Sequence, residues 1–360
     1  MRVALVCSWL NQYGGAERVL EAVHEIWPRA PLYTSIHDPR AMPATWQGWD
    51  IRPSWANRLP GISSHHRLYL PLYPAAFETT HLRGYDLVLS VSSGFASAVR
   101  YSGGKHVCYC LTPPRYLWGL QDYVSREGLT PWQQRLLRPL LAVMRIWDRR
   151  SSRRVSRFVA ISQEVQRRIG AFYGRESCII HPPVDTARFQ VRREVGDYLL
   201  IVGRLVPYRR IDLAIRACNE LRLPLKIVGD GRARPELEAL AGPTVEMLGR
   251  RPDAETTELI ECCRAFLWPG TEDFGIAPIE AQAAGRPVVA FAGGGALETV
   301  LDGETGVLFP EQKVESLKEA LLRLDGLRFE PERLRRHAQQ FDKRLFQERL
   351  QSYVHEVLSR

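Results

Sequence analysis

Short apolar runs alternate with segments of helical periodicity along the whole chain. Each run is typical of a buried strand, and parallel strands need a crossover helix between them. The alternation therefore predicts an α/β fold with parallel sheets built from βαβ units. The predicted strands of the first half are Arg2–Cys7, Leu32–Ser35, Tyr85–Ser90, His106–Cys110 and Arg157–Ile161. Those of the second half are Asp197–Val202, Leu225–Val228, Val245–Leu248, Ala265–Trp268, Pro287–Phe291 and Val307–Phe309.

The chain is long enough for two domains, each with its own core. Consecutive prolines in the segment 181–185 (His-Pro-Pro-Val-Asp) enforce an extended linker. We therefore expect domains at 1–183 and 184–340. The segment 341–360 contains a helical pattern, Lys343–Leu358, after the second sheet is complete, and it is free to return to the first domain. Other predicted helices are Ala16–Trp27 and one long helix, or a pair of helices, over Trp132–Ser156.

Two carboxylates flank a predicted strand-to-helix junction in the second half. Strand Ala265–Trp268 leads into a loop with Glu272, and Glu280 lies in the first turns of the helical pattern Ile276–Ala284. Gly275 allows the backbone to approach a ligand closely. Ligands of open α/β sheets bind in the crevice beyond the carboxyl ends of the strands. The unpaired N–H groups of a helix start favour an anionic or hydroxyl-rich ligand there, and a polyol fits best.

Two arginines follow the first strand of the second half. Arg204 comes directly after the sequence Leu200–Gly203, and Arg209 follows five positions later, on the turn into a helix. Guanidinium groups make bidentate, permanently charged contacts with a diphosphate. The alternative is a basic helix start that pairs with acidic neighbours. The shared crevice with Glu272 favours the ligand-binding interpretation.

Glycine-rich loops add weaker candidates. Gly14 and Gly15 link the first strand to the first helix, where exposed N–H groups suit an anion, although a tight turn would also explain one of them. Gly229-Asp-Gly231 lacks the third glycine of a dinucleotide loop, so a nicotinamide cofactor is not indicated. Arg250, after another strand end, could contact a base. Gly293–Gly295 could equally contact a ligand or permit close packing.

Composition limits the function classes only partly. The formal net charge of +9 suits phosphate ligands, an anionic membrane surface or nucleic acid alike, and nucleic-acid binding rests on charge alone. No uncharged apolar run is long enough for a spanning helix. The N-terminus looks like a buried strand rather than a signal peptide. Seven cysteines without a C-x2-C pair indicate reduced thiols, and hence a cytoplasmic protein.

Three motifs together resemble one known family. They are the loop Gly14-Gly15-Ala16-Glu17-Arg18, the pair Gly203-Arg204 with Arg209, and Glu272 seven residues before Glu280. The chain is similar over nearly its whole length to retaining glycosyltransferases of group 1, also called family 4. The resemblance implies the GT-B architecture, with two Rossmann-like domains facing a central cleft and a C-terminal helix that packs back on the N-domain. Thr112–Trp118 and Val206–Asp212 most resemble bacterial mannosyltransferase-like enzymes of polysaccharide and O-antigen assembly.

The resemblance also implies a reaction and residue roles. A sugar would pass from a nucleotide-diphosphate donor to a saccharide or lipid-linked saccharide acceptor, with retention of anomeric configuration and without a metal. Arg204 and Arg209 would bind the diphosphate, Glu280 the ribose and Glu272 the sugar. The catalytic candidates are thus Glu272, Arg204 and Arg209, and the donor-binding candidates are Gly14, Gly15, Arg250, Phe274, Gly275, Ile276 and Glu280.

Two positions depart from the family pattern. Arginine occupies position 209, where lysine is usual, and Leu111 occupies the histidine position of His-Thr-Pro, near the donor's 6-hydroxyl. A leucine cannot donate or accept a hydrogen bond, so we hypothesise a donor without that hydroxyl: a 6-deoxyhexose or a pentose rather than GDP-mannose. The alternatives are that His106 or a shifted loop does the work, or that the protein binds nucleotide-sugar with weakened catalysis.

The segment 131–157 is rich in arginine. It holds eight arginines and one aspartate, interleaved with apolar residues. We expect the apolar stripe to be core and the arginines to form a solvated face. The alternative is docking to an anionic inner leaflet, where a lipid-linked acceptor would lie and where the protein would be peripheral.

Overall fold

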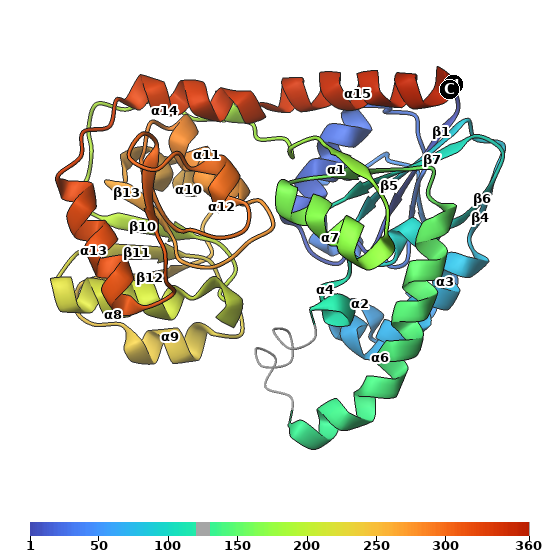
Figure 1. Ribbon diagram of the computed structural model, residues 1–360, viewed down its shortest axis with the longest axis horizontal. Helices are drawn as coiled ribbons and strands as arrows, with labels where there is room; N and C mark the ends of the chain where they lie inside the picture. The colour runs from blue at the N-terminus through green and yellow to red at the C-terminus, as the bar shows by residue number, and fades with distance from the viewer. Residues whose placement is uncertain (120–129, 360) are drawn as a thin grey trace. The chain divides into compact units, whose positions relative to one another are not determined.

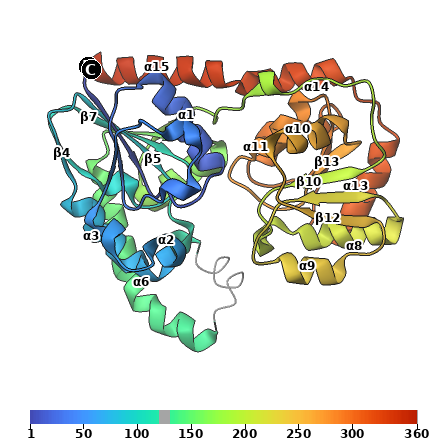
Figure 2. The ribbon, with the colours of Figure 1, turned by 180° about the vertical axis from the view of Figure 1, so that it is seen from behind.

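The computed structural model describes residues 1–119 and 130–359. The chain forms two compact units, one of Met1–Pro183 with Phe346–Arg360 and the other of Val184–Leu345. Each unit is built on its own parallel sheet with helices on both faces (Figures 1 and 2), which confirms the predicted α/β class. The predicted domain 184–340 is shorter than the second unit, which continues to Leu345. Within the described ranges, no helix combines the length and the apolar character needed to cross a membrane.

The first unit contains a seven-stranded sheet in the order β3-β2-β1-β5-β7-β8-β9, with every neighbouring pair parallel. The strand order changes direction between β1 and β5, so the topological switch point lies at their carboxyl ends. The strands are β1 (Val3–Cys7), β2 (Leu32–Thr34), β3 (Ile51–Pro53), β5 (Leu87–Ser92), β7 (Lys105–Cys110), β8 (Arg157–Ala160) and β9 (Ser177–Ile179), beside a separate pair, β4 (His81–Arg83) and β6 (Arg100–Ser102).

Helices cover both faces of this sheet, which explains why its central strands are apolar throughout rather than alternating. Helix α7 has a clear start and stop: the Ser162 hydroxyl accepts from the Val165 N–H at its beginning, and Gly174 adopts a left-handed conformation at its end. The helices of the unit are α1 (Gly15–Ile26), α2 (Ile62–His65), α3 (Tyr73–Thr79), α4 (Arg115–Trp118), α6 (Pro131–Ser151), α7 (Gln163–Tyr173) and α15 (Lys343–Ser359).

The second unit has a six-stranded parallel sheet in the order β12-β11-β10-β13-β14-β15, the doubly wound Rossmann order. Its switch point lies between β10 and β13. The strands are β10 (Leu199–Val202), β11 (Leu225–Val228), β12 (Val245–Gly249), β13 (Ala265–Trp268), β14 (Val288–Phe291) and β15 (Gly306–Phe309). The helices are α8 (Ile211–Leu221), α9 (Arg234–Leu240), α10 (Asp253–Cys262), α11 (Ile276–Ala283), α12 (Ala296–Thr299), α13 (Val314–Asp325) and α14 (Pro331–Ala338).

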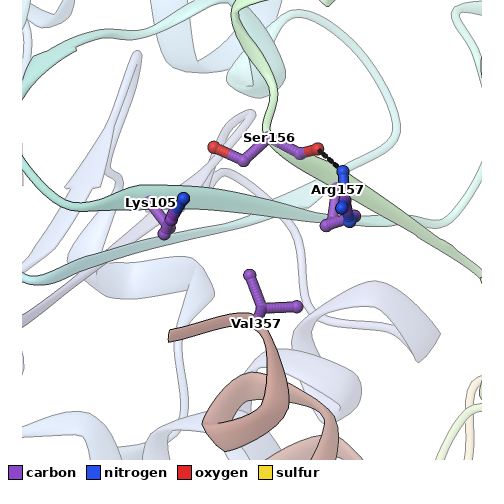
Figure 3. A pocket seen from close by; sticks show the side chains of 4 residues that line it. All are labelled: Lys105, Ser156, Arg157 and Val357. Atoms are coloured by element: carbon purple, nitrogen blue, oxygen red, sulfur yellow. Dashed lines mark hydrogen bonds between the residues drawn. The ribbon is translucent and has the colours of Figure 1, made fainter. Parts of the chain in front are cut away.

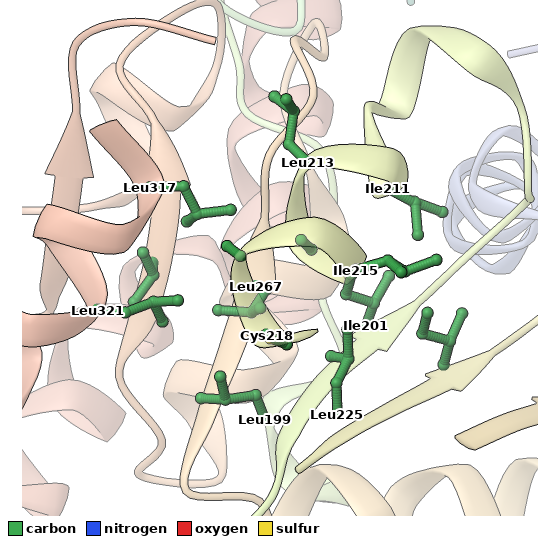
Figure 4. Close-up of a cluster of buried hydrophobic side chains, with 14 of the residues drawn as sticks. Leu199, Ile201, Ile211, Leu213, Ile215, Cys218, Leu225, Leu267, Leu317 and Leu321 are labelled. Carbon is green, nitrogen blue, oxygen red and sulfur yellow. The ribbon is translucent and has the colours of Figure 1, made fainter. Parts of the chain in front are cut away.

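The core of the second unit lies between this sheet and helices α8 and α13. Ile215 of α8 and Leu321 of α13 pack against strand residues such as Leu199, Ile201 and Leu267 (Figure 4). All are fully or almost fully buried. The amphipathic pattern of both helices thus holds the sheet from one face and fixes the ends of its strands.

Every strand predicted from the sequence is present, with bounds within two residues of those predicted. Four strands were not predicted: β3, β4, β6 and β9. Each is three residues long and none has the fully buried pattern of the central strands. A short, half-exposed edge strand leaves no apolar run in the sequence, so pattern analysis passes over it.

Helix α15 belongs to the first unit from Phe346 onward. The Phe346 ring meets Tyr109 of β7 edge to face at 5.4 Å, and the Gln347 amide donates to the carbonyl of Ala22 in α1. These contacts bear out the expectation that the closing helix packs on the N-terminal domain. Just before this helix, Asp342 pairs with Val184, the first residue of the second unit.

A buried carboxylate anchors α6 to its surroundings. Asp148 Oδ2 accepts from the Trp118 indole at 2.7 Å and from the Tyr173 hydroxyl at 2.9 Å. Burial raises the pKa of Asp148 from 3.8 to about 6, and these two hydrogen bonds offset only part of that rise. The carboxylate therefore links α6 to α4 and α7, and ionising it in this buried position lowers the stability of the fold as the pH rises.

We predict that the substitution Asp148→Asn stabilises the protein at neutral pH but not at pH 4. The folded-state pKa lies above the unfolded one, so the folded protein keeps the proton longer, and stability is lost as pH rises from about 4 to about 6. The amide removes this loss, a difference on the order of 2–3 kcal/mol. Urea unfolding of both proteins across this range measures it. A pH-independent difference between them would contradict the assignment.

Candidate functional site

The switch point of the second sheet gathers the charged residues predicted from the sequence. Arg204 and Arg209 follow β10, and Glu272 follows β13. Because β10 and β13 are hydrogen-bonded neighbours, the loops that leave their carboxyl ends start at the same place. This brings Arg209 and Glu272 into contact although they are far apart in sequence.

Arg209 and Glu272 form a largely buried ion pair. Arg209 Nη2 lies 3.0 Å from Glu272 Oε1, and the two side chains are 15% and 18% exposed. The guanidinium also lies over the Trp268 ring, 4.7 Å from its centre. Arg209 Nε has no hydrogen-bond partner among residues 1–119 and 130–359, and Glu272 Oε1 makes no hydrogen bond there beyond its charge contact with Arg209. Buried polar atoms of this kind are rare, and here both can serve a ligand.

Gly203 makes this position of Arg209 possible. A Cβ atom at residue 203 would lie only 1.9 Å from Arg209 Nη1, and the residue has φ of 155°. Any other amino acid would therefore displace the guanidinium from its place between Trp268 and Glu272. The glycine of the Gly203-Arg204 motif is required by the arginine six positions later.

The loop after β13 ends in an uncapped helix start. Gly275, with φ of 93°, is the N-cap of α11, and it supplies no side-chain cap to the helix. The N–H groups at Gly275 and Ile276 have no partner within the helix and carry its positive end. Phe274 is buried against Phe341, so only its backbone is available to a ligand. Glu280 lies one turn into α11 and is 9% exposed.

The triple glycine 293–295 allows its backbone to pack closely against the loop that carries Glu272. A Cβ at Gly294 would lie 2.2 Å from the carbonyl oxygen of Glu272, and one at Gly295 would lie 2.2 Å from Cα of Phe274. The Gly295 N–H donates to that same carbonyl at 2.9 Å. Of the two interpretations left open by the sequence, close packing is the one that this geometry supports, because the glycines hold the loop that carries Glu272.

The remaining predicted residues do not take part in this ion pair. Arg204 is exposed just beyond β10. Arg250 is exposed after β12, the edge strand, which β11 separates from β10. Gly14 and Gly15 lie in the first unit at the start of α1, after β1 and at that sheet's own switch point; α1 has no side-chain cap. In the described part of the chain, no three histidine, cysteine or acidic side chains gather in a way that could hold a metal ion.

His106 cannot take the place of the histidine missing at position 111. It is fully buried near the amino end of β7, where its Nε2 lies 2.9 Å from the Ser90 hydroxyl, and burial lowers its pKa to about 3. Leu111 follows the other end of the strand, where its N–H donates to the Ser92 carbonyl at the end of β5. The sequence-based alternative that His106 does this work is therefore wrong.

The first unit has a small pocket at the amino ends of its strands. It is lined by Lys105, Ser156, Arg157 and Val357 (Figure 3). Lys105 and Arg157 begin β7 and β8, so the pocket is at the amino ends of the strands, away from the switch point. It is separate from the candidate site.

Trp268 belongs to the site but was not among the residues predicted from the sequence. Its ring supports the Arg209 guanidinium, and its Nε1 would lie 3.4 Å from a Cβ at Gly275. The only signal was an aromatic residue at the last position of a buried strand, and such residues are usually core. The cation that lies over this ring, Arg209, belongs to the loop after β10, so the contact can be inferred only once β10 and β13 are known to be neighbours.

Comparisons with known proteins show which families and folds the chain is similar to. The family profile described as glycosyl transferases group 1 matches residues 196–325, which include Arg204, Arg209, Glu272 and Glu280. A D-inositol 3-phosphate glycosyltransferase of Thermomonospora curvata is 32% identical over 222 residues, 51% of each chain. A GDP-mannose-dependent phosphatidylinositol monomannoside mannosyltransferase of Mycolicibacterium smegmatis is 31% identical over 194 residues, 45% of this chain and 50% of that protein. The chain thus spans about half the length of the curated relatives it matches.

Solved structures match over almost the full chain. Anabaena HepE in complex with UDP superimposes with a TM-score of 0.74 and 18% identity, covering 99% of this chain and 100% of that one. The sucrose-phosphate synthase of Thermosynechococcus elongatus gives 0.75 and 16%, covering 99% of both. The fold is that of the GT-B glycosyltransferases. Residues 196–325, which form most of the second unit, match the profile of the glycosyl transferases group 1 family.

We predict that Gly203→Ala destabilises the second unit by about 2–3 kcal/mol, through backbone strain and collision with Arg209. In an Arg209→Ala background the collision disappears, so the same substitution should cost about 1 kcal/mol less. Denaturant unfolding of the four proteins of this cycle measures the coupling. Gly170→Ala in α7, where a Cβ meets nothing within 4 Å, is the control and should stabilise. Equal costs in both backgrounds would contradict the contact.

Proposed function

We propose that the protein is a retaining glycosyltransferase that moves a sugar from a nucleotide-diphosphate donor to a saccharide or lipid-linked saccharide acceptor, without a metal. The observation that carries the proposal is the Arg209–Glu272 pair. It stands at the switch point of a domain that matches the group 1 profile, beside a helix start whose N-cap is a glycine. The buried Arg209 Nε has no hydrogen-bond partner in the described chain, and the ion pair with Arg209 is the contact of the buried Glu272 Oε1.

The charges of the site match the parts of such a donor. Arg209, with the exposed Arg204 close along the chain, supplies N–H donors for the diphosphate. Glu272 Oε1 and the N–H groups at the start of α11 suit the hydroxyls of the transferred sugar. Glu280, in the same helix, suits the ribose hydroxyls. We also propose that Arg250, near the sheet edge, contacts the base of the nucleotide. The loop Gly14–Gly15 of the first unit would contact the diphosphate.

In the proposed reaction the bond between the sugar C1 and the phosphate oxygen breaks, and the acceptor oxygen bonds to C1 on the same face. The acceptor proton passes to the departing phosphate. Negative charge grows on the diphosphate as it leaves, and Arg209 faces that charge. Glu272 and Trp268 already hold the guanidinium in place, so it needs little reorganisation during the reaction. This preorganisation is how the protein would lower the activation barrier of sugar transfer.

We predict that Glu272→Gln and Arg209→Gln each lower turnover by roughly 10²–10³-fold, the usual cost of a group that stabilises charge in the transition state. Nucleoside diphosphate release in the presence of acceptor measures turnover. The matched controls are Glu246→Gln and Arg216→Gln, two exposed side chains of the same unit, which should keep full activity. Donor binding without turnover in the unsubstituted protein would instead favour a catalytically weakened nucleotide-sugar-binding protein.

The identity of residue 111 is the basis for our proposal that the transferred sugar lacks a 6-hydroxyl. This residue lies at the carboxyl end of β7, where a histidine would meet a 6-hydroxyl in related enzymes, and its side chain offers only apolar contact. A 6-deoxyhexose or a pentose leaves no hydroxyl there without a partner. The nucleotide is left to experiment, because one relative is named as GDP-mannose-dependent and HepE was solved with UDP.

We predict that the unsubstituted protein prefers a 6-deoxy donor to its 6-hydroxylated counterpart, and that Leu111→His shifts this ratio toward the hydroxylated sugar by about tenfold or more. Initial rates over a panel of GDP-, UDP- and dTDP-linked sugars give the ratio. Leu111→Met, which keeps an apolar side chain, is the control and should keep the preference. Comparable rates with GDP-mannose and a 6-deoxy donor would contradict the proposal.

A further inference from the structure

Helix α6 presents two apolar faces, and only one of them is used by the fold. Leu141 and Met144 point into the core of the first unit and are at most 7% exposed. On the other side Trp132, Val143 and Ile146 are 66%, 65% and 69% exposed. Such exposure is unusual for three large apolar side chains on one helix.

The exposed apolar residues share one face of α6. Trp132, Pro139, Val143 and Ile146 follow the spacing of a single helical stripe, which we call the outer ridge. Leu140, 39% exposed, lies at its margin. The buried residues 141, 144 and 148 fall on the opposite side. The sequence-based expectation of one apolar stripe in the core thus accounts for only half of the apolar residues of the helix.

Arginines flank the outer ridge along one side. Arg135, Arg138 and Arg149 lie about a quarter turn from it, and Arg150 continues its line at the C-terminal end. All four are exposed, and none forms an ion pair with a residue of the described chain. The one acidic side chain of the helix, Asp148, is buried on the inner side. The outer half of α6 is therefore apolar and positively charged, with no acidic group to offset it.

We infer that the outer ridge of α6 docks on a bilayer that contains anionic phospholipid. A helix with an apolar face bordered by basic residues lies in the membrane interface, its apolar side chains among the acyl chains and its arginines at the phosphates. Trp132 suits this boundary because its ring is amphipathic. Figure 1 shows the N-terminal part of α6 extending beyond the sheet of its unit, and the side chains of Trp132, Val143 and Ile146 are exposed.

Charge complementarity favours an anionic lipid surface over a second copy of this chain as the partner of the outer ridge. A second copy of this chain would bring the same arginines against each other, since a two-fold interface repeats its own surface. An anionic lipid surface pairs with every arginine at once. This inference goes beyond the proposed transfer reaction and does not depend on it, because binding to vesicles requires neither donor nor acceptor.

The test is flotation of the full-length protein with vesicles of phosphatidylcholine alone or mixed with phosphatidylglycerol, at low and high salt. We expect binding to the mixed vesicles, weakened by salt. The ridge variant Val143→Ser/Ile146→Ser and the flank variant Arg138→Gln/Arg149→Gln should each lower the partition coefficient by about tenfold or more, because each arginine at an anionic surface contributes about fivefold.

Matched controls come from exposed positions of the second unit. Leu322→Ser removes a side chain that is 60% exposed, and Arg216→Gln removes an exposed arginine; both should float like the unsubstituted protein. Equal melting temperatures establish that all the variants are folded. Equal flotation of the ridge variant and Leu322→Ser would overturn the inference. So would binding that is independent of phosphatidylglycerol, or a dimer in sedimentation that the ridge variant dissociates.

Discussion

The ion pair between Arg209 and Glu272 is the interaction on which the candidate site depends. It joins the loops after β10 and β13, the strands between which the order of the second sheet changes direction. Several features exist to hold it. Trp268 supports the guanidinium, Gly203 leaves room for it, and Gly294 and Gly295 hold the loop that carries Glu272. A largely buried ion pair contributes little net stability, because desolvation offsets the attraction. Its value is that it orients two charges before a ligand arrives.

Much of this could be predicted from the sequence. Buried parallel strands leave continuous apolar runs, so the central strands and the α/β class were clear. The position of the ligand crevice could be predicted because the loops that follow neighbouring strands lie close together. Arg209 and Glu272, which are on two such loops, are in contact. The short edge strands β3, β4, β6 and β9 could not be predicted, because they bury too little to leave a pattern.

The parts of the site that the sequence left open are those decided by packing. Trp268 could be placed under a cation only after β10 and β13 were known to be neighbours. The triple glycine was ambiguous until its distances to Glu272 and Phe274 distinguished close packing from ligand contact. Position in the strand also separated His106 from Leu111, at opposite ends of β7. Helix α6 shows the same limit, because periodicity identifies apolar faces but not which of them the fold covers.

The central claim is that Arg209 and Glu272 prepare this edge of the sheet for the diphosphate of a nucleotide-sugar. Calorimetric titration of one nucleoside as its monophosphate and as its diphosphate tests it most directly, in the unsubstituted protein and in Arg209→Gln. We predict that the unsubstituted protein binds the diphosphate at least about tenfold more tightly than the monophosphate, since an added charge-assisted contact is worth that much. The substitution should remove this preference. The same preference in both proteins would contradict it.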